Sequence, residues 1–342
     1  MAGRRTNLAL LGSLVVALAT GGLAFALGTP AGRLVVVAHG AAGLALVLLV
    51  PWKSAVARRG LARRRPGRGA SVPLAVLVAA AVASGTLHAM GVGAVGPVTA
   101  MQLHVGAALA AVPLLAWHAT ARRVRPRRTD LSRRNALRAG ALACGAGLAW
   151  AGLEGVARVA GLPGAGRRFT GSLRVESADP DHIPVTQWLD DRVPAIDPAG
   201  WRLEVRAGSR RRTLTYGELG MLADGEPGRR TDAVEAALDC TGGWYATARW
   251  EGVRLDRLLA GMGEGQSILV TSRTGYQRRL PFAAAGSLLL ATRVAGRPLS
   301  AGHGFPARLV VPGRRGFWWV KWVTSIEVDA TPAWRQPPFP LS

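Results

Sequence analysis

The sequence predicts a multidomain protein in which an N-terminal all-α bundle of transmembrane helices is followed by an α+β domain. Three observations lead to this fold class. The 342-residue chain carries a net charge of +23 although 49% of its residues are hydrophobic. Its first 140 residues combine the longest apolar runs with 18 of the 43 basic residues and a single acid, Asp130. From Arg167 onward, short alternating apolar runs separated by Gly, Pro and Asp take their place.

The position of the charge narrows the class of protein. A strongly basic chain ordinarily raises nucleic acid as a partner, but here most of the excess lies with the apolar part, which argues against that reading. Two cysteines cannot form a disulfide framework. The partner expected for the first part is therefore the lipid bilayer.

Four apolar stretches within residues 1–121 are long enough to cross a bilayer, which takes about 20 residues. They cover residues 7–27, 33–52, 72–95 and 100–121. The alternative is a soluble all-helical domain with basic loops, which leaves stretches of this length and apolarity unexplained. The sequence therefore predicts a four-helix transmembrane domain.

Basic residues are distributed unevenly between these stretches. The connections near Thr29 and Gly96 hold only Arg33, at a helix edge, so by the positive-inside rule they face outward and the N-terminus is cytoplasmic. We expect a multi-pass protein of the cell membrane. The basic residues of the cytoplasmic segments are Arg4, Arg5, Lys53, Arg58, Arg59, Arg63, Arg64, Arg65, Arg68, Arg122, Arg123, Arg125, Arg127 and Arg128.

Residues 122–165 form a basic loop and a fifth predicted transmembrane helix, from residue 139 to about 160, of a weaker apolar character. The run from Ser132 through Arg133 and Arg134 to Arg138 precedes it and resembles a twin-arginine export signal, with Ala136 in place of the usual Phe. A basic stop at a helix end is the alternative. The position before a large outer domain favours the signal, and because this route carries folded proteins, it implies a cofactor acquired in the cytoplasm.

Four histidines fall inside the predicted spans, where ionisable side chains are costly and usually functional. At about 1.5 Å per residue, His39, His88 and His104 lie at similar depth on the outer side, whereas His118 lies roughly 21 Å from His104. Two facing imidazoles are what an axially ligated haem b requires. We interpret two of His39, His88 and His104 as candidate haem iron ligands. Hydrogen bonds between helices, or a quinone site, are the alternatives.

Residues 166–342 are predicted to form the extracytoplasmic α+β domain, with strands at 201–205 and 267–270. The segment from Leu238 through Cys240 to Trp244 is followed by a W-x-G-V-x-L-x-x-L-L run that starts at Trp250. Further motifs follow in order: residues 274–276, 288–291, 296–299, 303–313 and 316–322. This ordered set, over about residues 168–335, resembles the sulfite oxidase-type molybdopterin domain.

The resemblance implies a molybdenum–molybdopterin cofactor in this domain. Cys240, the only cysteine in the domain, would be the catalytic residue and the molybdenum ligand, because a thiolate is a soft metal ligand. Cys144, in the fifth helix, is expected only to pack. The pterin ends in a phosphate that needs cationic and backbone donors. The cofactor-binding residues that the resemblance implies are His182, Ser272, His303, Arg308, Trp319, Val320 and Lys321.

Two departures from the family concern the substrate. Sulfite oxidases resemble this sequence around the H-x-P motif, but they place arginines where this chain has Pro180 and Tyr245. Four nearby arginines could compensate, although the sequence does not say that they point inward. They are Arg249, Arg273, Arg278 and Arg279.

Together these features predict a membrane-anchored molybdenum oxidoreductase, with molybdopterin and a haem b as cofactors. The expected chemistry is two-electron oxygen-atom transfer on a small sulfur-containing or sulfoxide-like molecule, with electrons exchanged with membrane quinone or another respiratory partner. The alternative from a different class is a non-catalytic cofactor-bearing or docking module of a membrane respiratory complex. A haem cytochrome whose outer domain serves only for docking is a third reading.

Overall fold

The computed structural model describes residues 2–61, 68–96, 98–121, 124, 127–175, 179–187, 191–224, 231–337 and 339. The chain divides into two compact units, Met1–Arg174 and Val175–Ser342. Part of the predicted cytoplasmic charge lies outside the described residues, namely Arg63, Arg64, Arg65, Arg122, Arg123 and Arg125.

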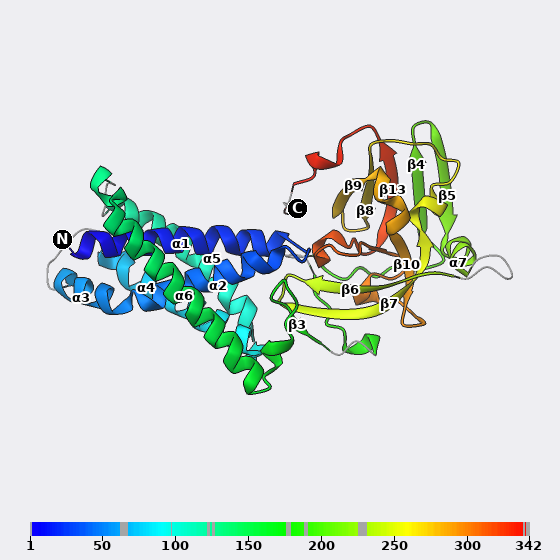
Figure 1. Ribbon diagram of the computed structural model, residues 1–342. Helices are drawn as coiled ribbons and strands as arrows, with labels where there is room; N and C mark the ends of the chain where they lie inside the picture. The colour runs from blue at the N-terminus through cyan, green and yellow to red at the C-terminus, as the bar shows by residue number, and fades with distance from the viewer. Residues whose placement is uncertain are drawn as a thin grey trace. The chain divides into compact units, whose positions relative to one another are not determined.

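The first unit is built of helices, as predicted, and Figure 1 shows them side by side as a bundle. Helix α1 packs against α2, α4 packs against α5, and α6 packs against α2. The helices are α1 (Ala2–Ala26), α2 (Gly32–Leu48), α3 (Val50–Leu61), α4 (Arg68–Met90), α5 (Ala100–Ala121) and α6 (Arg133–Val159).

The second predicted span is broken where the sequence suggested one continuous helix. Helix α2 ends at Leu48, α3 starts at Val50, and their axes differ by 43°. Pro51 explains the break, because its ring lacks an N–H and collides with the carbonyl of the preceding turn. The predicted span of residues 33–52 therefore covers α2 and the first residues of α3, with the bend between them.

The third predicted span is also shorter than expected. Helix α4 ends at Met90, because Gly91 has a φ of +107° that ends a helix. The residues that follow form a small hairpin of β1 (Ala94–Val95) and β2 (Val98–Thr99). Helix α6, by contrast, starts earlier than residue 139, at Arg133, so Arg133 and Arg134 form its first turn rather than precede it.

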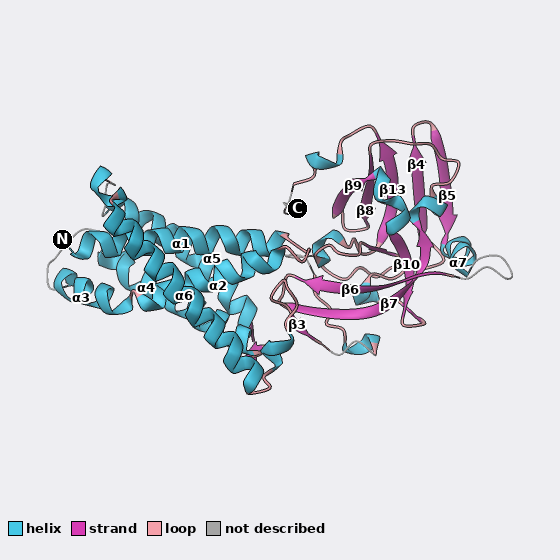
Figure 2. Ribbon diagram, in the orientation of Figure 1, coloured by secondary structure: helices cyan, strands magenta, loops and turns pink. Residues whose placement is uncertain are grey.

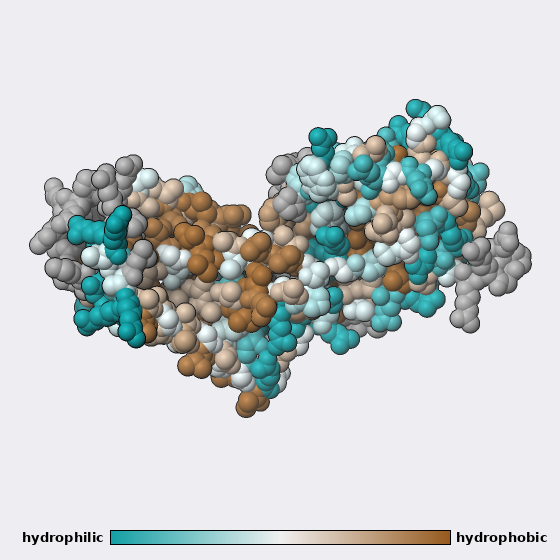
Figure 3. All heavy atoms as spheres, turned by 45° about the horizontal axis from the view of Figure 1, so that its top comes forward, coloured by the Kyte–Doolittle hydropathy of each residue, from teal (hydrophilic) through white to brown (hydrophobic). Residues whose placement is uncertain are grey.

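Several of these helices could cross a membrane. In the described part of the chain, α1, α4, α5 and α6 are long and apolar enough, and α2 with α3 would make a fifth span if the bend interrupts a single crossing. Large apolar side chains point outward from the bundle, among them Leu34, Leu109 and Leu148, each more than 60% exposed. Figure 3 shows this apolar surface over the helices, as expected for a lipid-facing bundle.

The second unit is a mixed α+β domain with two sheets, and the strands appear in Figure 2 with short helices between them. One sheet has the order β5-β4-β13-β8-β9, and in it only β4 and β13 run parallel. Its strands are β4 (Arg202–Ala207), β5 (Arg210–Thr215), β8 (Ser267–Ser272), β9 (Gln277–Pro281) and β13 (Val323–Asp329). The two predicted strands, β4 and β8, both lie in this sheet.

The other sheet is centred on an antiparallel hairpin. Strand β7 pairs with both β6 and β10, and β10 pairs in turn with β11 and β12. These strands are β6 (Asp232–Cys240), β7 (Trp244–Arg254), β10 (Leu289–Val294), β11 (Arg297–Pro298) and β12 (Arg308–Val310). Short helices α7 (Tyr216–Asp224) and α8 (Leu255–Leu258) complete the unit.

Alternation of side chains builds the core between these strands. In β4, Leu203 and Val205 are fully buried while Arg202 and Glu204 face outward, because successive side chains of a strand point to opposite faces. The largest buried side chain beside them, Trp250 on β7, is also fully buried and donates through Nε1 to the Ala236 carbonyl. This core holds the ends of β6, β8 and β12 in place, and these ends carry the candidate site.

Candidate functional site

Cys240 is the last residue of β6, at the tight turn into β7. The turn closes through a hydrogen bond from the Gly243 N–H to the Cys240 carbonyl, and Gly243 has a φ of +90°, which favours glycine. The Gly242 N–H lies 3.3 Å from Cys240 Sγ, as a donor to it. The hairpin therefore fixes the sulfur in position.

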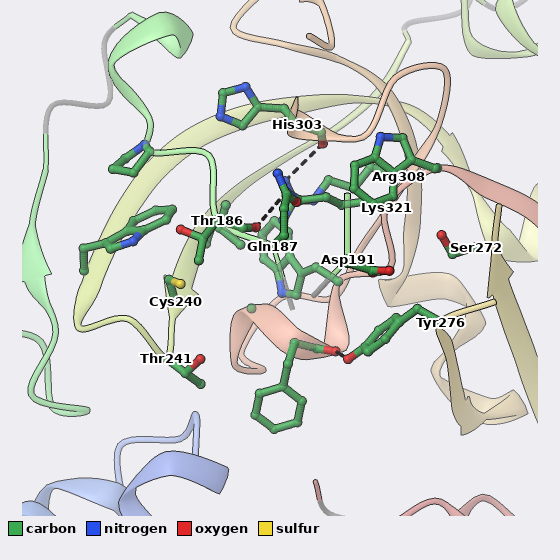
Figure 4. A pocket seen from close by; sticks show the side chains of 17 residues that line it. Thr186, Gln187, Asp191, Cys240, Thr241, Ser272, Tyr276, His303, Arg308 and Lys321 are labelled. Atoms are coloured by element: carbon green, nitrogen blue, oxygen red, sulfur yellow. Dashed lines mark hydrogen bonds between the residues drawn. The ribbon is translucent and has the colours of Figure 1, made fainter. Parts of the chain in front are cut away.

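The Cys240 sulfur faces a cavity of about 690 Å³ that includes its opening to solvent. Figure 4 shows Cys240 and Thr186 on one side of this cavity and Ser272 and Tyr276 on the other. The lining residues are Pro184, Thr186, Gln187, Asp191, Leu238, Cys240, Thr241, Trp244, Ser272, Tyr276, His303, Arg308, Gly316, Phe317, Trp319, Lys321 and Trp322.

Arg308, on β12, is the most deeply buried cation of this cavity, at 3% exposed. Its guanidinium lies over the rings of Trp250 and Trp319 and donates through Nη1 to the His303 carbonyl, 3.1 Å away. Burial lowers the pKa of Arg308 to about 10. Because desolvation penalises this charge, an anion in the cavity would stabilise it.

Lys321 lies beside Arg308, and its ammonium group has three acceptors. Nζ donates to the carbonyls of Thr186 and Gly302 at 2.9 and 2.6 Å and to Gln187 Oε1 at 2.8 Å. Burial, together with the neighbouring positive charge of Arg308, lowers the pKa of Lys321 to about 7. Three neutral acceptors orient this cation but do not neutralise it.

His303 is buried and fixes the turn that precedes Arg308. Its Nε2 lies 3.0 Å from the Ile183 carbonyl, which can only accept, and its Nδ1 lies 2.8 Å from Ser300 Oγ. Burial and the Arg308 charge lower its pKa. The next residue, Gly304, has a φ of +109°, and an added Cβ would lie 3.2 Å from Lys321 Cα, so glycine is required where these segments meet.

Behind the cysteine, Asp239 and Arg315 form a buried ion pair. Arg315 donates to Asp239 Oδ1 and, at 3.3 Å, to the carbonyl oxygen of Cys240. Burial raises the pKa of the Cys240 thiol, whereas the Gly242 N–H, the Thr186 side chain and the Arg315 charge act in the opposite direction. A bound metal ion would favour the thiolate in the same way that these donors do.

Comparison with known proteins gives this site its family. Residues 190–336 match the model of the oxidoreductase molybdopterin binding domain. The C-terminal unit is a sulfite oxidase-type molybdopterin domain. The mitochondrial sulfite oxidases of Drosophila melanogaster and Homo sapiens are each 31% identical to this chain, over 193 and 179 residues, or 46% and 44% of it. Sulfite oxidase of Gallus gallus is 30% identical over 195 residues, 46% of this chain and 39% of that protein.

The matched part is a fraction of those relatives, since the chain spans 31% of the length of the fly and human proteins. Among solved structures, the sulfane dehydrogenase SoxCD from Paracoccus pantotrophus matches 41% of this chain and 40% of its own, at 24% identity and a TM-score of 0.36.

The residues of the molybdopterin domain suit its cofactor. Cys240 would supply a soft ligand, and Arg308 and Lys321 would supply positive charge for an anionic pterin phosphate. Within the described residues, Arg308 Nε and Trp319 Nε1 are buried donors without a hydrogen-bond partner. Buried donors of this kind are normally satisfied, so they are available to a ligand in the cavity.

Six of the eight predicted residues of the molybdopterin domain line the cavity: Cys240, Ser272, His303, Arg308, Trp319 and Lys321. The other two lie elsewhere. His182 is largely exposed and forms a contact of 3.3 Å with Asp179. Val320 is fully buried, and its carbonyl accepts from the Leu309 N–H.

None of the four arginines considered as substitutes for the missing substrate arginines is among the described residues that line the cavity. Arg249 pairs with Glu251, and Arg279 pairs with Asp329. Arg278 is fully buried against the rings of Phe317 and Trp318, and Arg273 is exposed.

Sequence reasoning missed several lining residues and the ion pair behind Cys240. Thr186, Gln187 and Asp191 come from a segment without a motif, so nothing in the sequence marked them. Arg315 stood next to Arg314 in a basic run, and only the fold separates the buried one from the exposed one.

In the helical unit, the structure brings two of the three candidate haem ligands together. The Nε2 atoms of His39 and His104 lie 3.4 Å apart. His88 is directed elsewhere, with its Nε2 3.1 Å from the Gly171 carbonyl. His118 lies 3.2 Å from Ser71 Oγ through Nδ1.

Proposed function

We propose that this protein is a membrane-anchored, molybdopterin-dependent oxidoreductase that transfers an oxygen atom to or from a small sulfur compound outside the cytoplasm. The observation that carries the proposal is the cavity that unites Cys240 with Arg308 and Lys321. The family of the domain and its sulfite oxidase relatives support the same class of chemistry. The apolar helices support the membrane anchor.

We assign different roles to the residues of the cavity, namely binding of the cofactor and binding of the metal. Arg308, held by the His303 carbonyl, and Lys321, held by three acceptors, would bind the anionic end of the cofactor. Cys240, fixed by the hairpin turn, would bind the metal, which supplies the two-electron redox chemistry when present. Thr186 and Thr241 line the cavity beside the sulfur as neutral hydroxyl groups.

A neutral, sulfoxide-like substrate fits this cavity better than a dianion. Among the described lining residues, Arg308 and Lys321 are the arginine and lysine side chains, and the proposal assigns both to the cofactor. The two positions that carry arginine in sulfite oxidases hold Pro180 and Tyr245, and Trp244 adds an indole to the lining. We therefore favour sulfoxide reduction, in which two electrons and two protons yield a thioether and water.

Electrons for this reaction would come from the membrane, through the helical unit and a quinone or another respiratory partner. Export through the twin-arginine route would deliver the outer unit with its cofactor already bound. Arg133 and Arg134, both exposed at the start of α6, support this route.

The test uses full-length protein purified in detergent and compares Cys240→Ser with Cys144→Ser. Cys144 is the other cysteine and is exposed on α6, so it serves as the matched control. We expect about one molybdenum per chain and sulfoxide reduction with a chemical electron donor in the wild type and in Cys144→Ser, and loss of both in Cys240→Ser. Molybdenum-free wild-type protein, or sulfite turnover without sulfoxide turnover, would contradict the proposal.

A further inference from the structure

His39 on α2 and His104 on α5 face each other through their Nε2 atoms. The two atoms lie 3.4 Å apart, and the rings are nearly perpendicular, at 86°, with centroids 5.6 Å apart. They come from positions 65 residues apart in sequence, on helices that each pack mainly against another partner. The pair therefore joins the α1–α2 and α4–α5 hairpins.

The hydrogen bonds of the outer nitrogens define the tautomers. His39 Nδ1 lies 2.9 Å from the Ala17 carbonyl, and His104 Nδ1 lies 2.7 Å from the Ala81 carbonyl. A carbonyl oxygen can only accept, so each Nδ1 carries a proton, and each neutral imidazole then has a lone pair at Nε2. Two lone pairs directed at each other over 3.4 Å repel, unless a cation lies between them.

This arrangement is the one that metal-bound histidines show. A ligating imidazole almost always donates its second ring N–H to a carbonyl or carboxylate, which fixes both the tautomer and the ring orientation. A metal–imidazole bond is about 2.0 Å long, so two bound Nε2 atoms lie about 4 Å apart, close to the observed separation. Small rotations of either ring supply the difference.

Glycines let both rings approach the neighbouring helices. A Cβ at Gly85 on α4 would lie 2.7 Å from His104 Nδ1, and one at Gly21 on α1 would lie 3.1 Å from the His39 ring. The contact at Gly85 is shorter than real Cβ atoms show, so a side chain there would displace the His104 ring, whereas the contact at Gly21 is only tight. The rings are held by backbone on their outer side, which leaves the Nε2 side for a ligand.

The number of ligands selects the kind of metal centre. Within the described residues, no group of three or more His, Cys, Asp or Glu side chains is arranged to hold a metal ion. A bare zinc ion takes three or four protein ligands, whereas haem iron brings four equatorial nitrogens and needs only two axial ones. A site with two imidazoles inside apolar helices therefore fits haem.

We propose that His39 and His104 are the two axial ligands of a single haem b in the helical unit, and that His88 is not a ligand. His88 is buried at 6% exposure, and its Nε2 lies 3.1 Å from the Gly171 carbonyl, which accepts a hydrogen bond from it. His88 therefore binds the segment that follows α6 within its own unit. This inference concerns helices α1, α2, α4 and α5 and is independent of the molybdenum chemistry.

The test compares His39→Ala, His104→Ala and His88→Asn in full-length protein purified in detergent. The readouts are the haem content from extraction, the reduced-minus-oxidised visible spectrum and the molybdenum content. We expect one haem per chain and a six-coordinate low-spin spectrum in the wild type and in His88→Asn. Each alanine variant should lose haem at least about tenfold while molybdenum stays unchanged, which shows that the chain is folded.

His104→Met covers the case in which an alanine variant fails to fold, because a thioether is itself an axial haem ligand. This variant should keep haem and change its spectrum and reduction potential. Wild-type protein without porphyrin, with a bare metal ion or with neither, would overturn the proposal, as would loss of haem in His88→Asn together with full haem in His39→Ala. Cys240→Ser separates the two proposals, since it should lose molybdenum and keep haem.

Discussion

The Arg315 guanidinium donates to the Asp239 carboxylate directly behind Cys240, and both side chains are at most 4% exposed. The same guanidinium donates to the carbonyl oxygen of Cys240 at 3.3 Å. A buried ion pair is thereby attached to the backbone of the proposed metal ligand. The two charges of the pair satisfy each other, so Arg315 positions the β6–β7 turn, while Arg308 and Lys321 are the cations that we propose for the cofactor.

Arg315→Met should loosen this turn. Breaking a buried ion pair by removing one partner costs about 3–5 kcal/mol, because the other charge stays buried. We expect lower stability of the C-terminal unit and less molybdenum per chain, measured by limited proteolysis and elemental analysis. Arg314→Met is the matched control, since its exposed side chain contacts the Trp318 ring. Equal molybdenum in the two variants would contradict the positioning role.

Arg308→Met should weaken cofactor retention without emptying the core, because methionine fills a similar apolar path between Trp250 and Trp319. A hydrogen bond to a charged group contributes about 1.5–3 kcal/mol, which corresponds to roughly ten- to a hundredfold in affinity. Molybdenum per chain after dialysis is the measurement, with exposed Arg273→Met as the control. Retention equal to that of the control would exclude Arg308 as a cofactor contact.

Gly252→Ala should destabilise the sheet that carries Cys240. A Cβ at this position would lie 2.0 Å from the Leu290 carbonyl oxygen, where β7 and β10 pair. Backbone must move to admit it, at a cost of about 3 kcal/mol. Gly217→Ala, on α7, has open space around its added methyl group and should be neutral or slightly stabilising. Hydrogen exchange of β7 and β10 peptides measures the difference.

The Arg279–Asp329 pair should make the five-stranded sheet sensitive to acid. Asp329 Oδ1 accepts from Arg279 at 2.5 Å and from the Thr331 N–H at 2.8 Å. Although burial acts to raise the pKa of Asp329, these donors lower it below its usual value of 3.8. The folded state thus binds its proton less readily than the unfolded state.

The stabilisation from Asp329 is present above about pH 4 and disappears as the pH falls through the lowered pKa. As the pH falls from 5 to 2, the protection of β8, β9 and β13 peptides from hydrogen exchange should therefore decrease more steeply in the wild type than in Asp329→Asn. Parallel pH profiles of the two proteins would rule out this linkage.

Replacing Arg133 and Arg134 together by lysine should retain the C-terminal unit in the cytoplasm. The change keeps the positive charge, but a twin-arginine export signal is recognised through its arginines and not through charge alone. The measurement is protease accessibility of residues 175–342 from outside intact cells. A double change of Arg127 and Arg128 to lysine is the matched control in the same basic loop. Unchanged protease accessibility in the Arg133/Arg134 variant would contradict the hypothesis that these residues form an export signal.

The helices of the bundle could be predicted from the sequence, but the break between α2 and α3 was not. Apolar length predicted the helices, because a membrane-spanning helix needs a run that the composition alone reveals. The break after Leu48 was missed even though Pro51 is visible in the sequence. The length of an apolar run does not show where a helix breaks, whereas proline breaks it because it lacks the N–H for a helical hydrogen bond.

For the C-terminal unit, the ordered motifs around Cys240 and from His303 to Lys321 were sufficient to predict the domain type. They also named six residues that line the cavity. His182 is not among the lining residues, because a motif records the neighbourhood of a residue in the chain, whereas side-chain direction depends on the turn that carries it. Asp191 and Thr186 carried no motif and were found only through their position in space.

The sequence by itself determined the two-part architecture, the molybdopterin domain and the candidate thiolate Cys240, because hydropathy, charge and local motifs are properties of consecutive residues. Only the tertiary structure decided that His39 faces His104 while His88 turns to Gly171, and that Arg315 rather than Arg314 lies behind Cys240. These relationships join residues 65 to 83 positions apart. They depend on helix rotation, strand register and burial, which are set by packing across the whole fold.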